Sequence, residues 1–285
     1  MVFENICFSG GGSKTISFTG AIKALEEEKY LKGLCRFAGS SAGSLFATLL
    51  ACKFNADEII ELIKETNINE LAEGGIGQNL IRLAFNFGFY NGKAIEEWVE
   101  NMFRRKGLGK YTTFIEIYEV FGSELIITGT NLNKQRTVYY SPCKTPKMHV
   151  IEAIRISTSI PLFIQPVNIE GDLYGDGSLL CNYPIHIFKS VDRRLDKTIG
   201  FCVKDDKDHR TRHKFENIVQ FLDIIIGAIM KQSQYKYEKG KYARKTVLIN
   251  TYDVGATHFD INKEIKKKLI RWGHNDTLKW LKKQK

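Results

Sequence analysis

The sequence predicts an α/β fold, a three-layer sandwich in which helices cover both faces of a mainly parallel central sheet. Short apolar runs that suit buried strands alternate along the chain with segments whose apolar residues recur at helical spacing. Strands joined through helices pair in parallel, and a parallel sheet needs cover on both faces. The expected strands are at residues 5–9, 37–38, 124–129, 198–203 and 246–251, with an antiparallel neighbour at 137–141.

Length and composition favour one large domain. The chain has 285 residues, 43% of them hydrophobic, without a low-complexity linker or an internal repeat. We expect a core at residues 1–205, with the helices and strand of 206–285 completing the same domain and ending in a basic tail. The six cysteines form no C-x-x-C pair, which disfavours a zinc site and indicates a reducing compartment. No basic residue precedes Lys14, so we expect no signal peptide and a cytoplasmic location.

The first strand runs into a glycine-rich turn, Gly10-Gly11-Gly12-Ser13-Lys14, and a helix is expected at 19–29. A phosphate-binding P-loop would need a glycine at Phe8, and a dinucleotide-binding turn would need one at Thr15. The remaining interpretation is an oxyanion hole. Consecutive glycines let bare N–H groups approach a ligand closely, and Lys14 adds positive charge beside them.

The second strand ends in Gly39-x-Ser41-x-Gly43, and helical spacing of apolar residues begins directly after it. A strand that turns at once into a helix must bend sharply, and glycines two residues before and after the serine remove the Cβ atoms that would block the bend. The pattern predicts a nucleophile elbow that exposes Ser41 Oγ at a helix N-terminus, where developing negative charge is stabilised. A Gly/Ser loop that merely caps a helix is the alternative.

Helices are expected at 56–65, 93–105 and 215–231. Between the first two lie a glycine-rich stretch, residues 73–77, and an aromatic run, residues 85–90. These segments predict either an apolar lip over the site or aromatic side chains that fill the core.

A third motif, Asp176-Gly177, follows far downstream, and the three motifs together resemble the patatin-like phospholipase family. The glycine turn is similar to the oxyanion motif of that family, the elbow follows it as in family members, and residues 153–161 resemble the segment that precedes the family aspartate. The resemblance implies a patatin-like fold and a Ser41–Asp176 dyad. It also implies an oxyanion hole built from Gly10, Gly11 and Gly12 with Lys14.

The same resemblance implies a serine lipid acyl hydrolase that acts on a phospholipid or another acyl ester and needs no metal or cofactor. Two positions depart from the family pattern: Thr15 replaces a glycine, and Ser178 replaces a small apolar residue. Thr15 could reshape the oxyanion turn, because a β-branched residue resists positive φ. Asp172 competes with Asp176 for the role of base. No glycine follows it, so we interpret it as a turn residue.

Two other functions remain open from the sequence. One is a Ser-His esterase or acyltransferase that uses one of the six histidines, although none has a local signature. The other is a catalytically silent, basic lipid- or nucleic-acid-binding protein, with Tyr235, Tyr237 and Tyr242 among the lysines of 231–245 as its contact surface.

Net charge is +10, and residues 261–285 hold nine Lys or Arg against Glu264 and Asp276. Trp and Leu alternate with lysine in this tail, which suits peripheral contact with an anionic membrane, and nucleic acid is disfavoured as a partner. A terminal helix packed on the sheet is the alternative.

Overall fold

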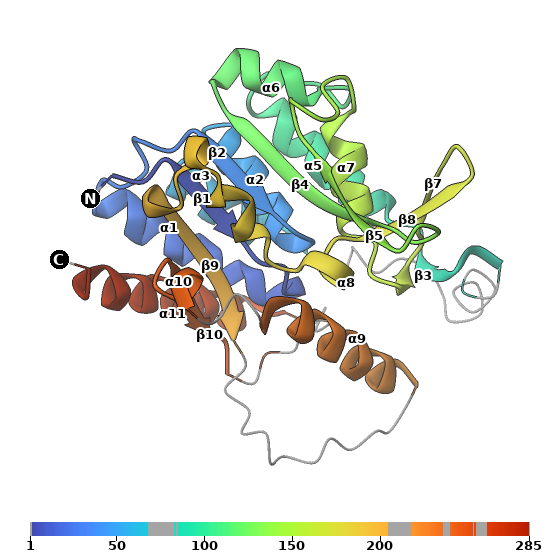
Figure 1. Cartoon of the computed structure of the whole chain (residues 1–285). Helices are drawn as coiled ribbons and strands as arrows, with labels where there is room; N and C mark the ends of the chain where they lie inside the picture. The colour runs from blue at the N-terminus through green and yellow to red at the C-terminus, as the bar shows by residue number, and fades with distance from the viewer. Residues whose placement is uncertain are drawn as a thin grey trace.

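Eight strands form one sheet in the computed structural model, which describes residues 2–67, 83, 85–204, 218–235, 240–252, 254 and 261–284. The strand order is β10-β9-β1-β2-β4-β8-β7, and β5 also pairs with β4 (Figure 1). The strands are β1 (Asn5–Phe8), β2 (Arg36–Gly39), β4 (Glu124–Asn131), β5 (Arg136–Tyr140), β7 (Val167–Ile169), β8 (Asp172–Asp176), β9 (Thr198–Lys204) and β10 (Thr246–Asn250). A separate pair consists of β3 (Gly88–Tyr90) and β6 (Leu162–Ile164).

The five strands from β10 to β4 are parallel, while β5, β8 and β7 join at one side in antiparallel pairing. The expected α/β class with a mainly parallel sheet is therefore confirmed, as is the antiparallel neighbour of β4. Asp172 was predicted as a turn residue, and this is wrong: it is the first residue of β8. The preceding Gly171, with φ 88°, makes the turn from β7.

The helices are α1 (Ser17–Glu27), α2 (Ala42–Ala51), α3 (Ala56–Glu65), α5 (Lys93–Arg104), α6 (Phe114–Phe121), α7 (Val150–Ser157), α8 (Ser178–Cys181), α9 (Ile218–Tyr235), α10 (Gly240–Ala243) and α11 (Lys263–Lys282). Short 3-10 helices are η1 (Gly12–Ile16), η3 (Pro184–Lys189), η4 (Val191–Arg193) and η5 (Leu195–Lys197). Helix α3 has the predicted bounds because Asn55 and Glu58 form a reciprocal capping box at its start.

The two faces of the sheet build two cores. Ile6 and Phe8 of β1 join the larger core with residues of α1 and α2, whereas Cys7 points to the other face and packs with Phe188 of η3. Strand β1 lies between β2, which follows it after α1, and β9, to which the chain returns much later. Ligands of open α/β sheets bind at the carboxyl ends of the strands at such a switch in strand order.

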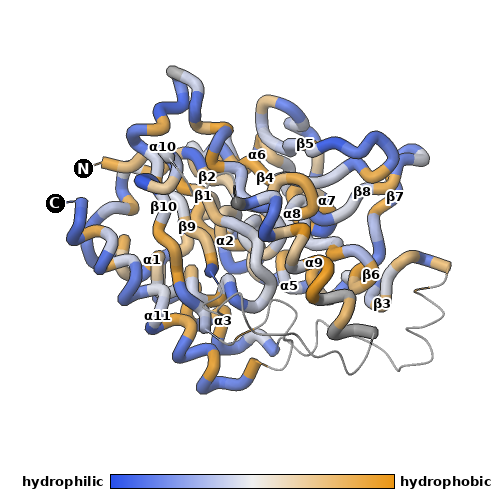
Figure 2. The backbone as a smooth tube through the Cα atoms, turned by 60° about the horizontal axis from the view of Figure 1, so that its bottom comes forward, coloured by the Kyte–Doolittle hydropathy of each residue, from blue (hydrophilic) through white to orange (hydrophobic). Residues whose placement is uncertain are grey.

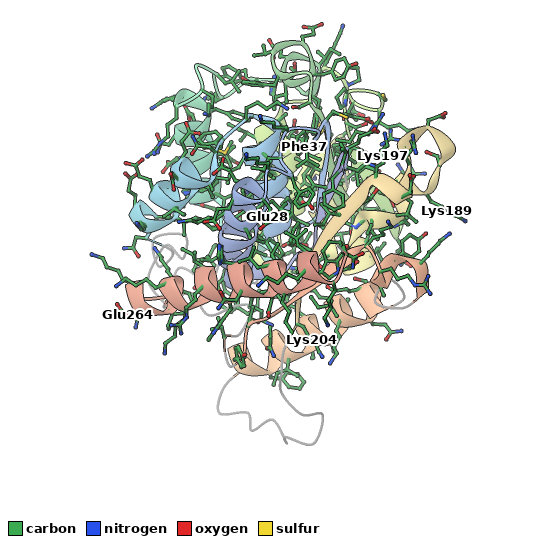
Figure 3. All side chains as sticks on the ribbon, turned by 90° about the vertical axis from the view of Figure 1, so that its left-hand side faces the viewer. Glu28, Phe37, Lys189, Lys197, Lys204 and Glu264 are labelled. Atoms are coloured by element: carbon green, nitrogen blue, oxygen red, sulfur yellow. The ribbon has the colours of Figure 1, made fainter. Side chains whose placement is uncertain are left out.

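Helix α11 packs beside α1 and against β10, and Figure 3 shows it running below α1 from near Glu264. Leu269 and Leu281 are buried, and Lys266 Nζ donates to the carbonyl oxygens of Ile63 and Thr66 at 2.9 and 2.5 Å. Most of the apolar side chains of the basic tail therefore stabilise the fold. The assignment of residues 206–285 to the same domain stays a prediction, which the pairing of β10 with β9 supports.

Candidate active site

Ser41 occupies the sharp turn between β2 and α2. Its backbone has φ 51° and ψ −135°, a conformation that residues with a Cβ rarely adopt and that needs support from the surrounding structure. Its N–H donates to Ser157 Oγ at 2.9 Å, and its carbonyl oxygen accepts from Ser44 Oγ at 2.6 Å. These hydrogen bonds hold the strained turn, with Ser41 as the N-cap residue of α2.

The turn also depends on the two flanking glycines. A Cβ on Gly39 would lie 2.4 Å from Gly43 O, and a Cβ on Gly43 would lie 2.4 Å from Ser9 O. Both obstacles are backbone atoms, which cannot move without shifting β1 or the elbow itself. Any larger residue at either position would therefore open the turn.

Asp176 reaches Ser41 from the antiparallel side of the sheet. Strand β8 pairs with β4 so that Asp176 lies opposite Gly129. Ser41 Oγ donates to Asp176 Oδ2 at 2.7 Å, and Ser178 N–H donates to Asp176 Oδ1 at 2.7 Å. A Cβ on Gly177 would lie 2.3 Å from Thr128 Oγ1, so the glycine lets the chain pass close to β4 after the aspartate.

The environment of Asp176 favours proton uptake. The side chain is fully buried, and burial raises its pKa from 3.8 to about 6, while hydrogen bonds from Ser178 and Ser41 oppose that rise. A carboxylate with this pKa is a stronger base than an ordinary aspartate, yet it is still mostly ionised at neutral pH. Asp172, on the same strand, forms an ion pair with Lys134 at 2.5 Å, and the hydrogen bond from Lys134 lowers its pKa.

The glycine-rich turn after β1 lies beside the elbow. Because β1 and β2 are parallel with Phe8 opposite Gly39, the turns that follow them leave the sheet at the same end. A Cβ on Gly10 would lie 2.9 Å from Ser41 Cβ and 2.4 Å from Asn182 Oδ1. The two predicted motifs are therefore in contact.

The donors of this turn differ from one another. Gly10 N–H donates to Asn182 O at 3.0 Å and is occupied. Among the residues that the structure describes, no acceptor takes the N–H groups of Gly11 and Gly12. Of the three predicted oxyanion donors, Gly10 is therefore the one whose N–H has an acceptor among the described residues.

Thr15 does not strain the turn. The positive φ falls on Gly12, at 54°, and Thr15 lies in η1, where its Oγ1 donates to Gly12 O at 2.7 Å. Lys14 lies in the same 3-10 helix and is 9% exposed, so it contributes little to the outer surface.

Three supporting residues were not predicted as part of the site, although Asn182 follows the Asp-Gly pair as it does in the family that the sequence resembles. Ser157 accepts from Ser41 N–H, Asn182 accepts from Gly10 N–H, and Ser233 Oγ donates to Ser178 O at 2.8 Å. Ser157 lies in the segment 153–161 that carried the family resemblance, and this is the one signal that could have indicated it. The partners of Ser233 and Asn182 come from distant elements, so local patterns cannot reveal them.

The described histidines make other contacts. His186 Nε2 lies 3.0 Å from Tyr139 OH, His274 Nε2 lies 2.7 Å from Glu27 Oε2, and His149 packs beside Tyr111. The remaining three, His209, His213 and His258, lie outside the described residues, as does Tyr237. Ser41 Oγ thus donates a hydrogen bond to a carboxylate, and no histidine of the described chain contacts it in this way.

The predicted apolar lip is described only in part. The glycine-rich stretch, residues 73–77, lies outside the described residues. Phe85 and Phe87 are exposed, so they do not fill the core, whereas Phe89 lies beside Phe163.

Within the described chain, no group of three or more His, Cys, Asp or Glu is arranged to hold a metal. No described helix is both long and apolar enough to cross a bilayer.

The sequence matches a family model and several known proteins. The family model described as Patatin-like phospholipase matches residues 6–189, which include the glycine turn, the elbow and the Asp-Gly motif. Protein R571 of Acanthamoeba polyphaga mimivirus, described as uncharacterized, is 33% identical over 279 residues, covering 95% of this chain and 91% of that protein. A "probable lipid hydrolase", 463L of Invertebrate iridescent virus 6, is 26% identical over 201 residues, covering 68% of this chain and 66% of that protein.

Solved structures also share the fold. The crystal structure of VipD from Legionella pneumophila aligns with a TM-score of 0.66 at 18% identity, covering 99% of this chain and 67% of VipD. At that identity the likeness concerns the fold alone.

Proposed function

Because the chain belongs to the patatin-like phospholipase family, we propose that it is a serine lipid acyl hydrolase in which Ser41 and Asp176 form the catalytic dyad. The observation that carries this proposal is the 2.7 Å hydrogen bond from Ser41 Oγ to the buried Asp176 carboxylate. A buried carboxylate whose pKa is raised to about 6 can take a proton from the serine more readily than an exposed one. The substrate class is a phospholipid or another acyl ester.

In the acylation step, Asp176 Oδ2 accepts the hydroxyl proton while Ser41 Oγ forms a bond to the ester carbonyl carbon. The carbonyl oxygen becomes an oxyanion, which Gly11 N–H and Gly12 N–H stabilise. The intermediate then releases the alcohol, which takes the proton from Asp176, and the acyl group stays on Ser41.

Deacylation repeats the sequence with water. Asp176 accepts a proton from the water as its oxygen attacks the acyl carbon, and the same N–H groups hold the second oxyanion. Collapse of this intermediate releases the fatty acid and returns the proton to Ser41 Oγ. Removing one oxyanion donor typically lowers turnover by on the order of 10²- to 10³-fold.

Labelling with a fluorophosphonate probe tests the proposal. The probe should modify Ser41, and peptide mapping should find no label in Ser41→Ala protein of unchanged fold. Ser40→Ala is a matched control, because Ser40 is equally buried but makes no hydrogen bond to Asp176. A wild-type protein that hydrolyses no ester and takes up no label would instead favour the catalytically silent lipid-binding protein.

A further inference from the structure

Helix α9 has one buried face and one exposed apolar face. Ile226, Met230 and Gln234 recur every four residues and are buried. Ile225 and Ile229 recur at the same spacing, but each is 41% exposed, and Phe221 lies one turn before them on the same face. Figure 2 shows α9 as a largely hydrophobic stretch, and in Figure 1 it lies at the outside of the molecule beside α8.

Helix α8, which packs against α9, carries another exposed apolar residue. Leu180, which is 41% exposed, lies on this short helix, against which α9 packs. We call Leu180, Ile225 and Ile229 the docking patch. Single exposed apolar residues are common, whereas a contiguous apolar group on one side of a soluble domain indicates a surface that another apolar phase covers.

The docking patch is connected to the active site through the last turn of α9. Ser233 Oγ donates to Ser178 O at 2.8 Å, and Ser178 N–H donates to Asp176 Oδ1 at 2.7 Å. On the same turn, Gln234 Oε1 accepts from Asn182 Nδ2 at 2.8 Å, and Asn182 O accepts from Gly10 N–H. A surface that binds α9 therefore lies next to the segments that carry Asp176 and the glycine turn.

The lysines near the docking patch indicate what kind of partner surface it binds. Lys231 is exposed on α9 two residues after Ile229, and the 15 residues 231–245 contain six Lys or Arg against a single acidic residue, Glu238. Apolar side chains followed by cations suit the boundary between headgroups and acyl chains of an anionic lipid surface. An amphipathic helix that binds at such a boundary lies in the plane of the interface.

We infer that the docking patch binds the surface of an anionic lipid aggregate and thereby places the Ser41 site at the interface from which it takes its substrate. The inference rests on the proposed lipid hydrolase function. It assigns membrane contact to α9 and α8, because most apolar side chains of the basic tail are packed in α11.

The test uses the double variant Ile225→Ser/Ile229→Ser in the full chain. Binding is measured in a Ser41→Ala background, by co-sedimentation with phosphatidylcholine vesicles that do or do not contain phosphatidylglycerol. The double variant should lower binding to the anionic vesicles by roughly tenfold or more, about 1.4 kcal/mol, since each serine removes an apolar side chain from the interface. Binding of the parent protein should weaken as salt is raised.

Activity is measured with the native serine. Hydrolysis of vesicle phospholipid should fall in parallel with binding, while hydrolysis of a soluble short-chain ester should stay within about twofold, because neither isoleucine touches the reacting groups. Val120→Ser is the matched control: Val120 is 61% exposed on α6, at the opposite end of the molecule in Figure 1, and its loss should change neither measurement.

Three results would overturn the inference: no binding of Ser41→Ala protein to anionic vesicles, unchanged binding by the double variant, or a loss of dimers in the double variant on gel filtration. The last result would identify a second copy of the chain as the occupant of the patch. Patch-dependent binding by a wild-type protein that hydrolyses no ester would refute the proposed enzyme function and leave docking supported.

Discussion

Asp176→Asn should inactivate the enzyme and stabilise the protein at neutral pH. The amide keeps the shape of the carboxylate: its oxygen can accept from Ser178 N–H and its NH₂ group can donate to Ser41 Oγ. It cannot accept the proton of the serine, so turnover should fall by on the order of 10³-fold or more. It also removes a charge from a fully buried position.

The size of the stabilisation follows from the pKa. Burial raises the Asp176 pKa from 3.8 to about 6, and each pKa unit corresponds to about 1.4 kcal/mol. The ionised side chain therefore costs the folded state about 3 kcal/mol relative to the unfolded chain. Because the folded pKa lies above the unfolded value, this cost is fully present above pH 6. It disappears as the pH falls from 6 towards 4, where the folded state takes up the proton first.

Thermal and urea unfolding of both proteins between pH 4 and pH 8 measures this difference. The variant should be more stable at pH 7.5, and the advantage should shrink towards zero near pH 4. Asp172→Asn is the matched control, because it makes the same change on the same strand at an exposed ion pair; activity should be retained and no stabilisation should appear. An Asp176→Asn protein that keeps a tenth of wild-type turnover, or one that is less stable than wild type at pH 7.5, would refute the reasoning.

Three further outcomes are expected. Ser41→Ala should abolish ester hydrolysis while the free energy of unfolding stays within about 1 kcal/mol of wild type; turnover by the folded variant would exclude Ser41 as the nucleophile. Gly11→Val should lower kcat far more than it raises KM, because a Cβ at Gly11 would lie 2.4 Å from Val203 Cγ2 and displace a proposed oxyanion donor; equal effects would indicate a purely binding role. The wild-type rate should fall about tenfold per pH unit below pH 6 as Asp176 is protonated, and a flat profile down to pH 5 would contradict its role as base.

Much of the fold could be predicted because its signals are local. Hydrophobic periodicity gave the class and most strands, and it also gave the bounds of helix α3, whose start the structure shows to be fixed by a capping box of neighbouring residues. Strands β7 and β8 were not predicted. They are short and only half-buried over most of their length, so they lack the continuous apolar run that identifies a central strand.

The residue types of the candidate site could be predicted from local spacing. A sharp turn needs the glycines at Gly39 and Gly43, and Gly177 lets the chain lie close to β4 just after Asp176. These requirements are visible as glycine spacing along the chain. Contacts between distant elements determine which backbone N–H groups are occupied and how readily Asp176 takes up a proton. Asn182 occupies the N–H of Gly10, Ser157 holds the N–H of Ser41, and burial raises the Asp176 pKa.

The same distinction separates the two apolar helices near the C-terminus. Both α9 and the basic tail combine apolar residues with lysines, and the sequence left open whether the tail contacts lipid or packs on the sheet. Leu269 and Leu281 of α11 are buried in the main core, whereas Ile225 and Ile229 of α9 stay 41% exposed beside α8. Amphipathic spacing predicts that a helix has an apolar face. Whether a neighbouring element already covers that face depends on how the chain packs, because the neighbour comes from elsewhere in the chain.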